Sequence, residues 1–282
     1  MILIDNTQIL LASIFAQIRG DDSLIDEDFV RHMTLNTYRM YKRKYEDQYG
    51  ELVICQDAGN YWRKDVFENY KQNRKDSQKK DSKDWNKIFG VLTKIRDEVS
   101  EVFPYKHMYV ARCEADDIIA TLVKHNHEKE KIMIVSADKD FQQLHKYKNV
   151  KQYSPTQKKN LVCDNPQEFL KSHIIKGDSS DGIPNILSDG DTFVNPEKRQ
   201  KRLTKNVMNK IEQSLAEGSI PDDISENWER NERLVNLDFI PEEIENEILA
   251  EWEKPITGDR GKIFNYFMDN RLKVLMESIE EF

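Results

Sequence analysis

Three short stretches of the chain are continuously apolar, at residues 2–4, 52–55 and 132–135, and residues 107–110 form a possible fourth. Each is rich in aliphatic or β-branched residues, and none alternates between apolar and polar positions. Continuous apolar runs of this length are typical of strands that are covered on both faces, as in a parallel sheet. The pattern therefore predicts a mostly parallel central sheet.

Helical periodicity fills the intervals between these runs. Apolar residues recur at helical spacing over residues 29–45, 88–103 and 115–125. Strands that alternate with such helices indicate βαβ units, so we expect an α/β fold whose sheet is flanked by helices. Beyond residue 166 the pattern is helical with breaks at 182–196 and 218–221, which favours an α/β domain over residues 1–165 and a helical domain over residues 166–282.

One segment, residues 72–84, has no apolar residue. It consists of Lys, Arg, Asp, Ser, Gln and Asn and cannot bury a face against a core. We expect it to be mobile and to project from the sheet domain.

Composition and charge exclude several classes of protein. The chain of 282 residues has 12 Phe, 11 Tyr and 4 Trp, enough for a packed core, and only 10 Gly and 8 Pro. No run of 18 apolar residues predicts a membrane helix, and the start of the chain does not resemble a signal peptide. The three cysteines, Cys55, Cys113 and Cys163, lie far apart in the sequence. This spacing fits reduced thiols, and we expect a cytoplasmic location, which for a phage protein would be the cytoplasm of the host cell.

The net charge of −8 argues against nucleic-acid binding until the order of the charges is considered. Residues 61–83 contain eight basic and four acidic residues, and residues 198–210 contain six basic residues and no acidic one. Acidic residues outnumber basic ones by fourteen to two over residues 211–253. A basic run is most often a solvated helix face, but two runs with aromatic neighbours favour a polyanion as partner.

Acidic residues follow each predicted strand. Asp5, Asp57 and Asp138 come at or just after the strand ends, Asp140 follows two residues later, and Glu114 and Asp116 come after the possible fourth strand. The carboxyl ends of parallel strands meet at one edge, where open sheets bind ligands. Each Asp alone could be a turn residue or a helix cap, and Asp117 could serve the dipole of its helix. Clustered carboxylates repel one another unless cations lie between them, and oxygen ligands suit Mg²⁺ or Mn²⁺.

A further acidic motif lies in the predicted helical domain. Asp178 and Asp181 occur in the stretch Lys-Gly-Asp-Ser-Ser-Asp-Gly-Ile-Pro at residues 176–184. By itself the stretch is a good turn, but its spacing can also direct two carboxylates at a second cation. The six histidines form no ligand spacing on a predicted helix and are assigned to structure or surface.

In their order along the chain, these motifs resemble the flap endonuclease/5′-nuclease superfamily. They are Asp5, Asp57, the Glu-Ala-Asp-Asp tetrad at 114–117, Ser-Ala-Asp-Lys-Asp at 136–140 and Gly-Asp-Ser-Ser-Asp-Gly-Ile-Pro at 177–184. The stretches 56–63, 69–74, 140–145 and 260–267 are similar to those of the T-even bacteriophage ribonuclease H group, 5′-to-3′ exonucleases and flap endonucleases that remove RNA primers from lagging-strand fragments. The resemblance covers nearly the whole chain and implies a PIN-like core.

The resemblance also implies roles for individual residues. It places Asp5, Asp57, Asp116 and Asp138, with Glu114 nearby, at a first metal site and Asp140, Asp178 and Asp181 at a second, so that two Mg²⁺ ions are expected, with Mn²⁺ as a substitute. The resemblance predicts an arch at about residues 61–85 that bridges the active site. Tyr70, Lys71 and Arg74 match the base of this arch, and Arg63 lies in the segment that leads to it. Further contacts with nucleic acid are expected from Lys64, Lys75, Lys198, Arg199, Lys201, Arg202 and Lys205.

The chain departs from the superfamily pattern after Gly177. Gly182 stands where the family usually has Asn, and the glycine-rich hairpin that follows in other members has no match at residues 186–191. The usual helix–hairpin–helix grip on duplex DNA and its potassium site are therefore in question, and residues 198–210 are expected to supply phosphate contacts instead.

The expected partners are DNA and RNA–DNA hybrids with a 5′ flap or nick, acted on by a monomer. The family also suggests a single-stranded-DNA-binding protein and a sliding clamp. Two alternatives remain open. A phosphatase with Asp5 as nucleophile is disfavoured because Thr7 stands where a second acid is usual. A non-catalytic DNA-binding module would have no need for clustered carboxylates.

Overall fold

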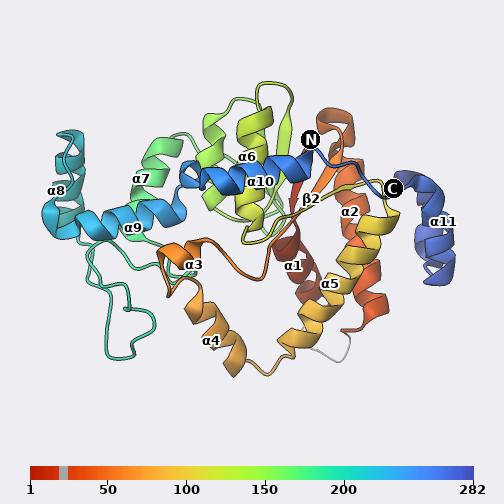
Figure 1. The fold of residues 1–282 in the computed structure, drawn as a ribbon, viewed down its shortest axis with the longest axis horizontal. Coiled ribbons are helices and arrows are strands. Elements are labelled where there is room, and N and C mark those ends of the chain that lie inside the picture. Colours follow the sequence, from red (N-terminus) through yellow and green to blue (C-terminus); the bar gives the residue numbers. More distant parts are fainter. Residues whose placement is uncertain (19–24) are drawn as a thin grey trace. The chain divides into compact units, whose positions relative to one another are not determined.

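The structure, a computed structural model, describes residues 1–18 and 25–282. The chain divides into two compact units (Figure 1). Unit 1 comprises Met1–Gly59, Lys83–Val162 and Glu242–Phe282, and unit 2 comprises Asn60–Ser82 and Cys163–Pro241. The chain passes from one unit to the other after residue 162, close to the expected boundary at 165. It also passes between the units after residues 59, 82 and 241.

Unit 1 contains a six-stranded sheet in the order β3-β2-β1-β4-β5-β6. The strands are β1 (Ile2–Asp5), β2 (Leu52–Gln56), β3 (Lys106–Tyr109), β4 (Ile132–Val135), β5 (Val150–Ser154) and β6 (Lys159–Leu161). All neighbouring pairs are parallel except β5 and β6, which are antiparallel. The four predicted strands and the mostly parallel sheet are confirmed.

The helices of unit 1 pack around this sheet. They are α1 (Asn6–Ile18), α2 (Glu27–Tyr49), α5 (Trp85–Val102), α6 (Ala115–Asn126), α10 (Glu242–Trp252), α11 (Arg260–Asp269) and α12 (Lys273–Met276), with 3-10 turns at Asp140–Lys146 and Ile279–Glu281. Apolar residues of α1, α2, α5 and α11 form one core cluster with β1 and β2. Helix α10 contacts α6 (Figure 1), where the Nζ of Lys124 lies 2.6 Å from a carboxylate oxygen of Glu245.

Unit 2 is helical. Its helices are α3 (Arg63–Val66), α4 (Gln72–Lys80), α7 (Pro166–Lys176), α8 (Lys205–Ala216) and α9 (Ser225–Val235), with 3-10 turns at Asp222–Ile224 and Leu237–Phe239. The core contains Phe67, Ile175, Ile186 and Trp228. The helical character predicted beyond residue 166 is confirmed.

Helix α4 covers most of the segment that was expected to be mobile. The absence of apolar positions gave no reason to predict a helix there, and none of its residues is buried. Among the residues that the structure describes, no helix is both long and apolar enough to cross a membrane. None of the three cysteines forms a disulfide.

Candidate active site

Three carboxylates of unit 1 gather at the carboxyl ends of adjacent strands. Asp5 is the last residue of β1, Asp57 follows β2, and Asp138 lies three residues after β4. Because β2, β1 and β4 are parallel neighbours in the sheet, these ends meet at one edge. The convergence predicted from the sequence is therefore present in unit 1.

Asp5 lies buried beside the negative charges of Asp57 and Asp138. Its side chain is buried, and burial together with the charges of Asp57 and Asp138 raises its pKa from 3.8 to about 7. The Ser136 hydroxyl donates a hydrogen bond of 2.7 Å to Asp5 Oδ2, which opposes part of that shift. Without a cation, a negative charge on Asp5 is unfavourable at this edge of the sheet.

Backbone amides hold the other two carboxylates. The Ala115 amide donates to Asp57 Oδ1 at 2.9 Å, and the Asp140 amide donates to Asp138 Oδ1 at 2.9 Å. Both Asp57 and Asp138 remain half-buried, so part of each side chain is accessible. Each carboxylate thus has a fixed orientation at an accessible edge.

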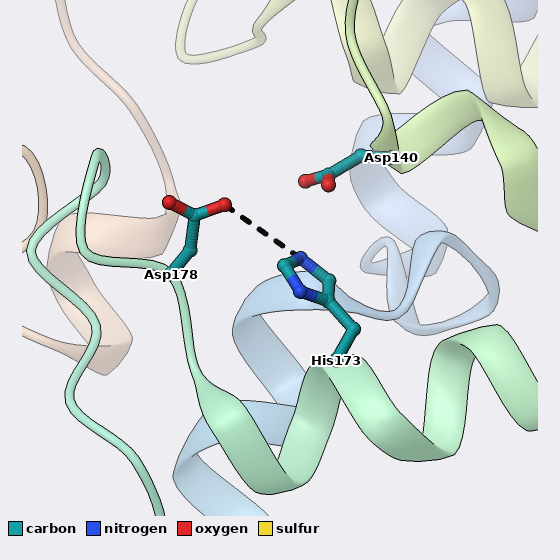
Figure 2. Close-up of side chains that lie close together, drawn as sticks. All are labelled: Asp140, His173 and Asp178. Carbon is teal, nitrogen blue, oxygen red and sulfur yellow. Dashed lines mark ion pairs between the residues drawn. The ribbon is translucent and has the colours of Figure 1, made fainter.

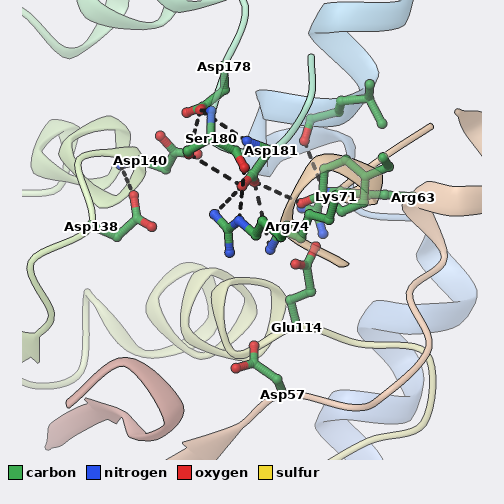
Figure 3. Close-up of polar contacts among 12 residues, drawn as sticks. Asp57, Arg63, Lys71, Arg74, Glu114, Asp138, Asp140, Asp178, Ser180 and Asp181 are labelled. Carbon is green, nitrogen blue, oxygen red and sulfur yellow. Dashed lines mark hydrogen bonds and ion pairs between the residues drawn. The ribbon is translucent and has the colours of Figure 1, made fainter. Parts of the chain in front are cut away.

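The acidic tetrad at the start of α6 divides between two environments. Glu114 is the N-cap and is buried, and it forms a capping box with Asp117, which is also fully buried. The Glu114 amide donates to Asp117 Oδ2 at 2.9 Å. Asp116 is half-buried in the first turn. Asp117 therefore stabilises the start of this helix. Figure 3 shows the Glu114 side chain above that of Asp57.

These residues fit a divalent cation. The donors are carboxylate oxygens, which are the ligands that Mg²⁺ and Mn²⁺ prefer. Burial, followed by the charges of Asp57 and Asp138, raises the pKa of Asp5, and a bound cation would offset both effects. Asp5, Asp57 and Asp138 are the residues best placed to hold it, with Asp116 and Glu114 on the neighbouring helix start.

Sequence reasoning missed the polar residues that support this edge. Gln8 Oε1 accepts hydrogen bonds from the Ala137 amide at 2.7 Å and the Ser136 hydroxyl at 3.1 Å. Gln152, fully buried on β5, donates from Nε2 to the Asp138 carbonyl at 2.6 Å. No sequence signal identified Gln152, because the exposed Lys151 interrupts the strand that carries it.

In unit 2, basic residues of the arch base surround Asp181 (Figure 3). Tyr70 donates its hydroxyl to Asp181 Oδ2 at 3.2 Å, and the Lys71 ammonium lies 3.7 Å from the same oxygen. Arg74 pairs with Asp181 Oδ1 and donates from Nε to the Ser180 carbonyl at 2.9 Å. Asp181 is buried, whereas the Arg74 side chain is 47% exposed and can reach a ligand.

The Asp178 carboxylate shapes the turn that follows α7. Its Oδ1 accepts hydrogen bonds from the Ser180 amide at 2.8 Å and the Ser180 hydroxyl at 2.6 Å. Figure 2 shows His173 of α7 beside Asp178, with 3.8 Å between Nε2 and Oδ2. The sequence assigned His173 to structure or surface, since a lone histidine on a helix gives no recognisable ligand spacing.

Glycine is required at the start of this turn. Gly177 has φ +64°, and a Cβ there would lie 2.4 Å from the Ile183 carbonyl oxygen. The Asp178 and Ile183 backbones form an isolated antiparallel bridge. The turn after α7 is thus a tightly closed loop.

The predicted basic contacts differ in accessibility. Arg63 is buried, and its Nε donates to the Leu234 carbonyl at 2.9 Å, so these contacts give it a packing role; its catalytic role stays a prediction. Lys64 is half-buried, and burial followed by the charge of Lys75 lowers its pKa. Lys198 binds two carboxylates, Asp189 at 2.9 Å and Asp191 at 2.7 Å.

The remaining members of the second basic run are open to solvent. They precede or lie on α8, and they are Arg199, Lys201, Arg202, Lys205 and Lys210. Lys75 of α4 is exposed as well.

Family models match both parts of the chain. Residues 1–173 match a 5′-3′ exonuclease N-terminal resolvase-like domain, and residues 166–282 match the C-terminal domain of T4 RNase H. Ribonuclease H of Enterobacteria phage T4 is 34% identical over 99% of this chain and 95% of its own length. Flap endonuclease Xni of Shewanella denitrificans is 30% identical over 68% of this chain and 79% of its own.

Solved structures share the fold. The bacteriophage T5 D15 flap endonuclease, in a complex with DNA and metal ions, has a TM-score of 0.64 at 17% identity and covers 90% of this chain and 99% of that one. The T5 5′-exonuclease with bound zinc also has a TM-score of 0.64, at 15% identity, and covers 91% and 99%.

The exonuclease family model and the identity to ribonuclease H both extend across the residues that form the carboxylate edge of unit 1. The chain belongs to the 5′-3′ exonuclease and flap endonuclease family, and it is a metal-dependent nuclease that hydrolyses phosphodiester bonds.

Proposed function

We propose that this nuclease acts from 5′ ends, as an exonuclease and flap endonuclease on DNA and RNA–DNA duplexes, and that it removes RNA primers during lagging-strand synthesis. The carboxylate edge of unit 1 carries the proposal, because Asp5, Asp57 and Asp138 converge there and the pKa of Asp5 is raised to about 7. Such a site is suited to cations and, once they are bound, to the phosphates of a nucleic acid.

Two divalent cations are proposed, as the family pattern implies. Asp5, Asp57, Asp116 and Asp138, with Glu114, would serve the first, and Asp140, Asp178 and Asp181 the second. Bound cations would activate water and stabilise the oxygen that leaves. The protein's own contribution is to fix the carboxylates: Ser136 donates to Asp5, and the amides of Ala115 and Asp140 orient Asp57 and Asp138.

The arch base would neutralise the scissile phosphate. Lys71 and Arg74 lie against Asp181, and a phosphate that exchanges with this carboxylate would receive two cationic donors already held close together. Tyr70 is buried and hydrogen-bonded to Asp181, so its contribution would be to position that carboxylate.

The test is a duplex with a 5′-labelled flap and a second with a nicked RNA–DNA strand, each incubated with Mg²⁺ or EDTA. Short 5′-labelled products that form only with Mg²⁺ support the activity and its polarity. Products from the 3′ end, or products in EDTA, contradict it. Trapping of a phosphorylated enzyme would instead support the Asp5 phosphatase.

Arg74→Ala is expected to lower the rate of flap cleavage by roughly 10²-fold, because one pre-positioned charged donor is lost from the transition state. Lys79→Ala is the matched control, since Lys79 lies on the same helix with a side chain that is 75% exposed. Single-turnover rates with saturating enzyme separate this effect from weaker binding. An Arg74→Ala rate equal to that of the Lys79→Ala control would contradict the role.

DNA binding should depend strongly on salt. If the exposed basic residues make ~6 phosphate contacts, affinity falls roughly 10³-fold between 50 and 200 mM salt. Fluorescence anisotropy with a flap substrate measures this slope. Lys201→Ala should reduce the slope by about one contact, whereas Lys198→Ala should change it less, since two carboxylates already bind Lys198. A slope near zero is incompatible with phosphate-driven binding.

A further inference from the structure

A cavity of about 310 Å³ lies in unit 1 beside β3, the outermost strand at one end of the sheet. Its volume lies at the small end of the range for small-molecule sites. Strand β3, the end of helix α5 and the segment after α10 line it, and the lining includes Arg96, Tyr105, His107, Tyr109 and Lys254. None of these residues belongs to the carboxylate edge or to the arch base.

Hydrogen bonds join the segments that form the wall of the cavity. The Thr257 hydroxyl donates to the Ser100 carbonyl at 2.8 Å, and the Asp259 amide donates to the Val102 carbonyl at 3.0 Å. A Cβ at Gly258 would lie 1.8 Å from the Phe103 carbonyl oxygen, so glycine is required for this close approach. The Lys106 ammonium donates to the carbonyls of Glu251 and Lys254 at 2.8 and 2.6 Å.

Two buried polar atoms belong to residues that line this cavity. The Tyr105 hydroxyl and His107 Nε2 have no hydrogen-bond partner among the residues that the structure describes. Buried polar atoms are nearly always hydrogen-bonded, so one such atom on β3 and another on the residue just before this strand call for an explanation. Burial lowers the pKa of His107 to about 3, so its imidazole is neutral and offers one donor and one acceptor.

The same cavity has an aromatic face and cationic side chains. Tyr109 is 46% exposed, and the Arg96 guanidinium lies 5.0 Å from the centre of its ring. Lys254 is 64% exposed and is paired with Glu251 at 2.6 Å. An exposed ring suits a nucleobase, and the neutral imidazole of His107 suits the polar edge of that base. Arg96, paired with Asp97 at 2.6 Å, and Lys254 suit a phosphate that displaces their carboxylate partners.

We propose that this cavity binds a 5′-mononucleotide, with the base on Tyr109 and the phosphate towards Arg96 and Lys254. The choice of a mononucleotide over another phosphorylated aromatic compound rests on the proposed function, because a 5′-exonuclease releases mononucleotides. The cavity, whose lining includes Gln56 at the end of β2, would then be a second nucleotide site on unit 1 that does not depend on cations.

The test is calorimetric titration of the full chain with dAMP, 2′-deoxyadenosine and inorganic phosphate, all in EDTA. Without cations, the carboxylate edge repels phosphate, so binding that persists in EDTA reports the cavity. We expect dAMP to bind, Tyr109→Ala to weaken it roughly ten-fold, and Tyr109→Phe to retain it. Phe264→Ala is the matched control, because Phe264 is 53% exposed on α11 and does not line the cavity.

Lys254→Ala should remove the advantage of dAMP over 2′-deoxyadenosine, and it also tests the site should Tyr109→Ala fail to fold in a thermal melt. The proposal is overturned by absence of dAMP binding in EDTA, by equal binding in folded Tyr109→Ala, or by phosphate binding as tightly as dAMP. Failure of the proposed nuclease function would show separately, as absence of Mg²⁺-dependent products in the flap assay.

Discussion

Asp138→Asn should lower the rate of flap cleavage by roughly 10³-fold or more while the variant still binds its substrate. Asp138 is one of three converging carboxylates, and its replacement by a neutral amide weakens the hold on a cation that supplies several kcal/mol to the reaction. Its Oδ1 accepts the Asp140 amide, a contact that the Asn carbonyl oxygen can preserve, so the local fold should survive.

Single-turnover cleavage and anisotropy binding, both in Mg²⁺, separate the two effects for Asp138→Asn. Asp47→Asn is the matched control, since it makes the same charge change at an exposed position on α2. Wild-type cleavage by Asp138→Asn would refute the assignment of this residue to the metal site.

Asp5→Asn should make the metal-free protein more stable at alkaline pH. The folded-state pKa of Asp5 is about 7, above the ordinary 3.8, so the protonated folded form is favoured. That stabilisation is fully present below about pH 4 and is lost as pH rises through 7, when a buried carboxylate must ionise beside Asp57 and Asp138. The amide removes this cost, which is on the order of 2–4 kcal/mol.

Thermal melts in EDTA at pH 4 and pH 8 measure the effect of Asp5→Asn. The variant should melt several degrees above wild type at pH 8 and close to it at pH 4, whereas Asp47→Asn should follow wild type at both. Mg²⁺ should stabilise wild type more than Asp5→Asn. A difference that does not depend on pH would contradict the ionisation of Asp5 as its cause.

The strands of the sheet could be predicted from the sequence where burial on both faces gives a continuous apolar run. Strands β1, β2 and β4 are continuously apolar because both faces are covered, and the Asp at or after each end then locates the carboxylate edge. Strand β5 was missed because Lys151 interrupts it, and its polar Gln152 is buried to support Asp138. Strand β6 is three residues at the antiparallel edge, with little apolar surface to reveal it.

The surroundings of the site residues could not be predicted in the same way. Nothing in the sequence distinguishes Lys198, which binds Asp189 and Asp191, from the exposed Lys201 three residues later. Likewise, Arg63 and Arg74 look alike as basic residues of one run, yet the first is buried against Leu234 and the second is exposed. These differences come from tertiary packing, which local spacing does not encode.

Unit 1 begins with the first residues of the chain and is completed by residues 242–282. Phe103, at the end of α5, packs against Tyr266, Phe267 and Phe282, with ring centres 5.6, 6.1 and 5.7 Å away. During synthesis on the ribosome, these partners emerge only after every residue of unit 2 has been made. Full nuclease activity should therefore arise only after translation of this region is finished, and a premature stop near residue 241 should yield an insoluble product rather than a weaker enzyme.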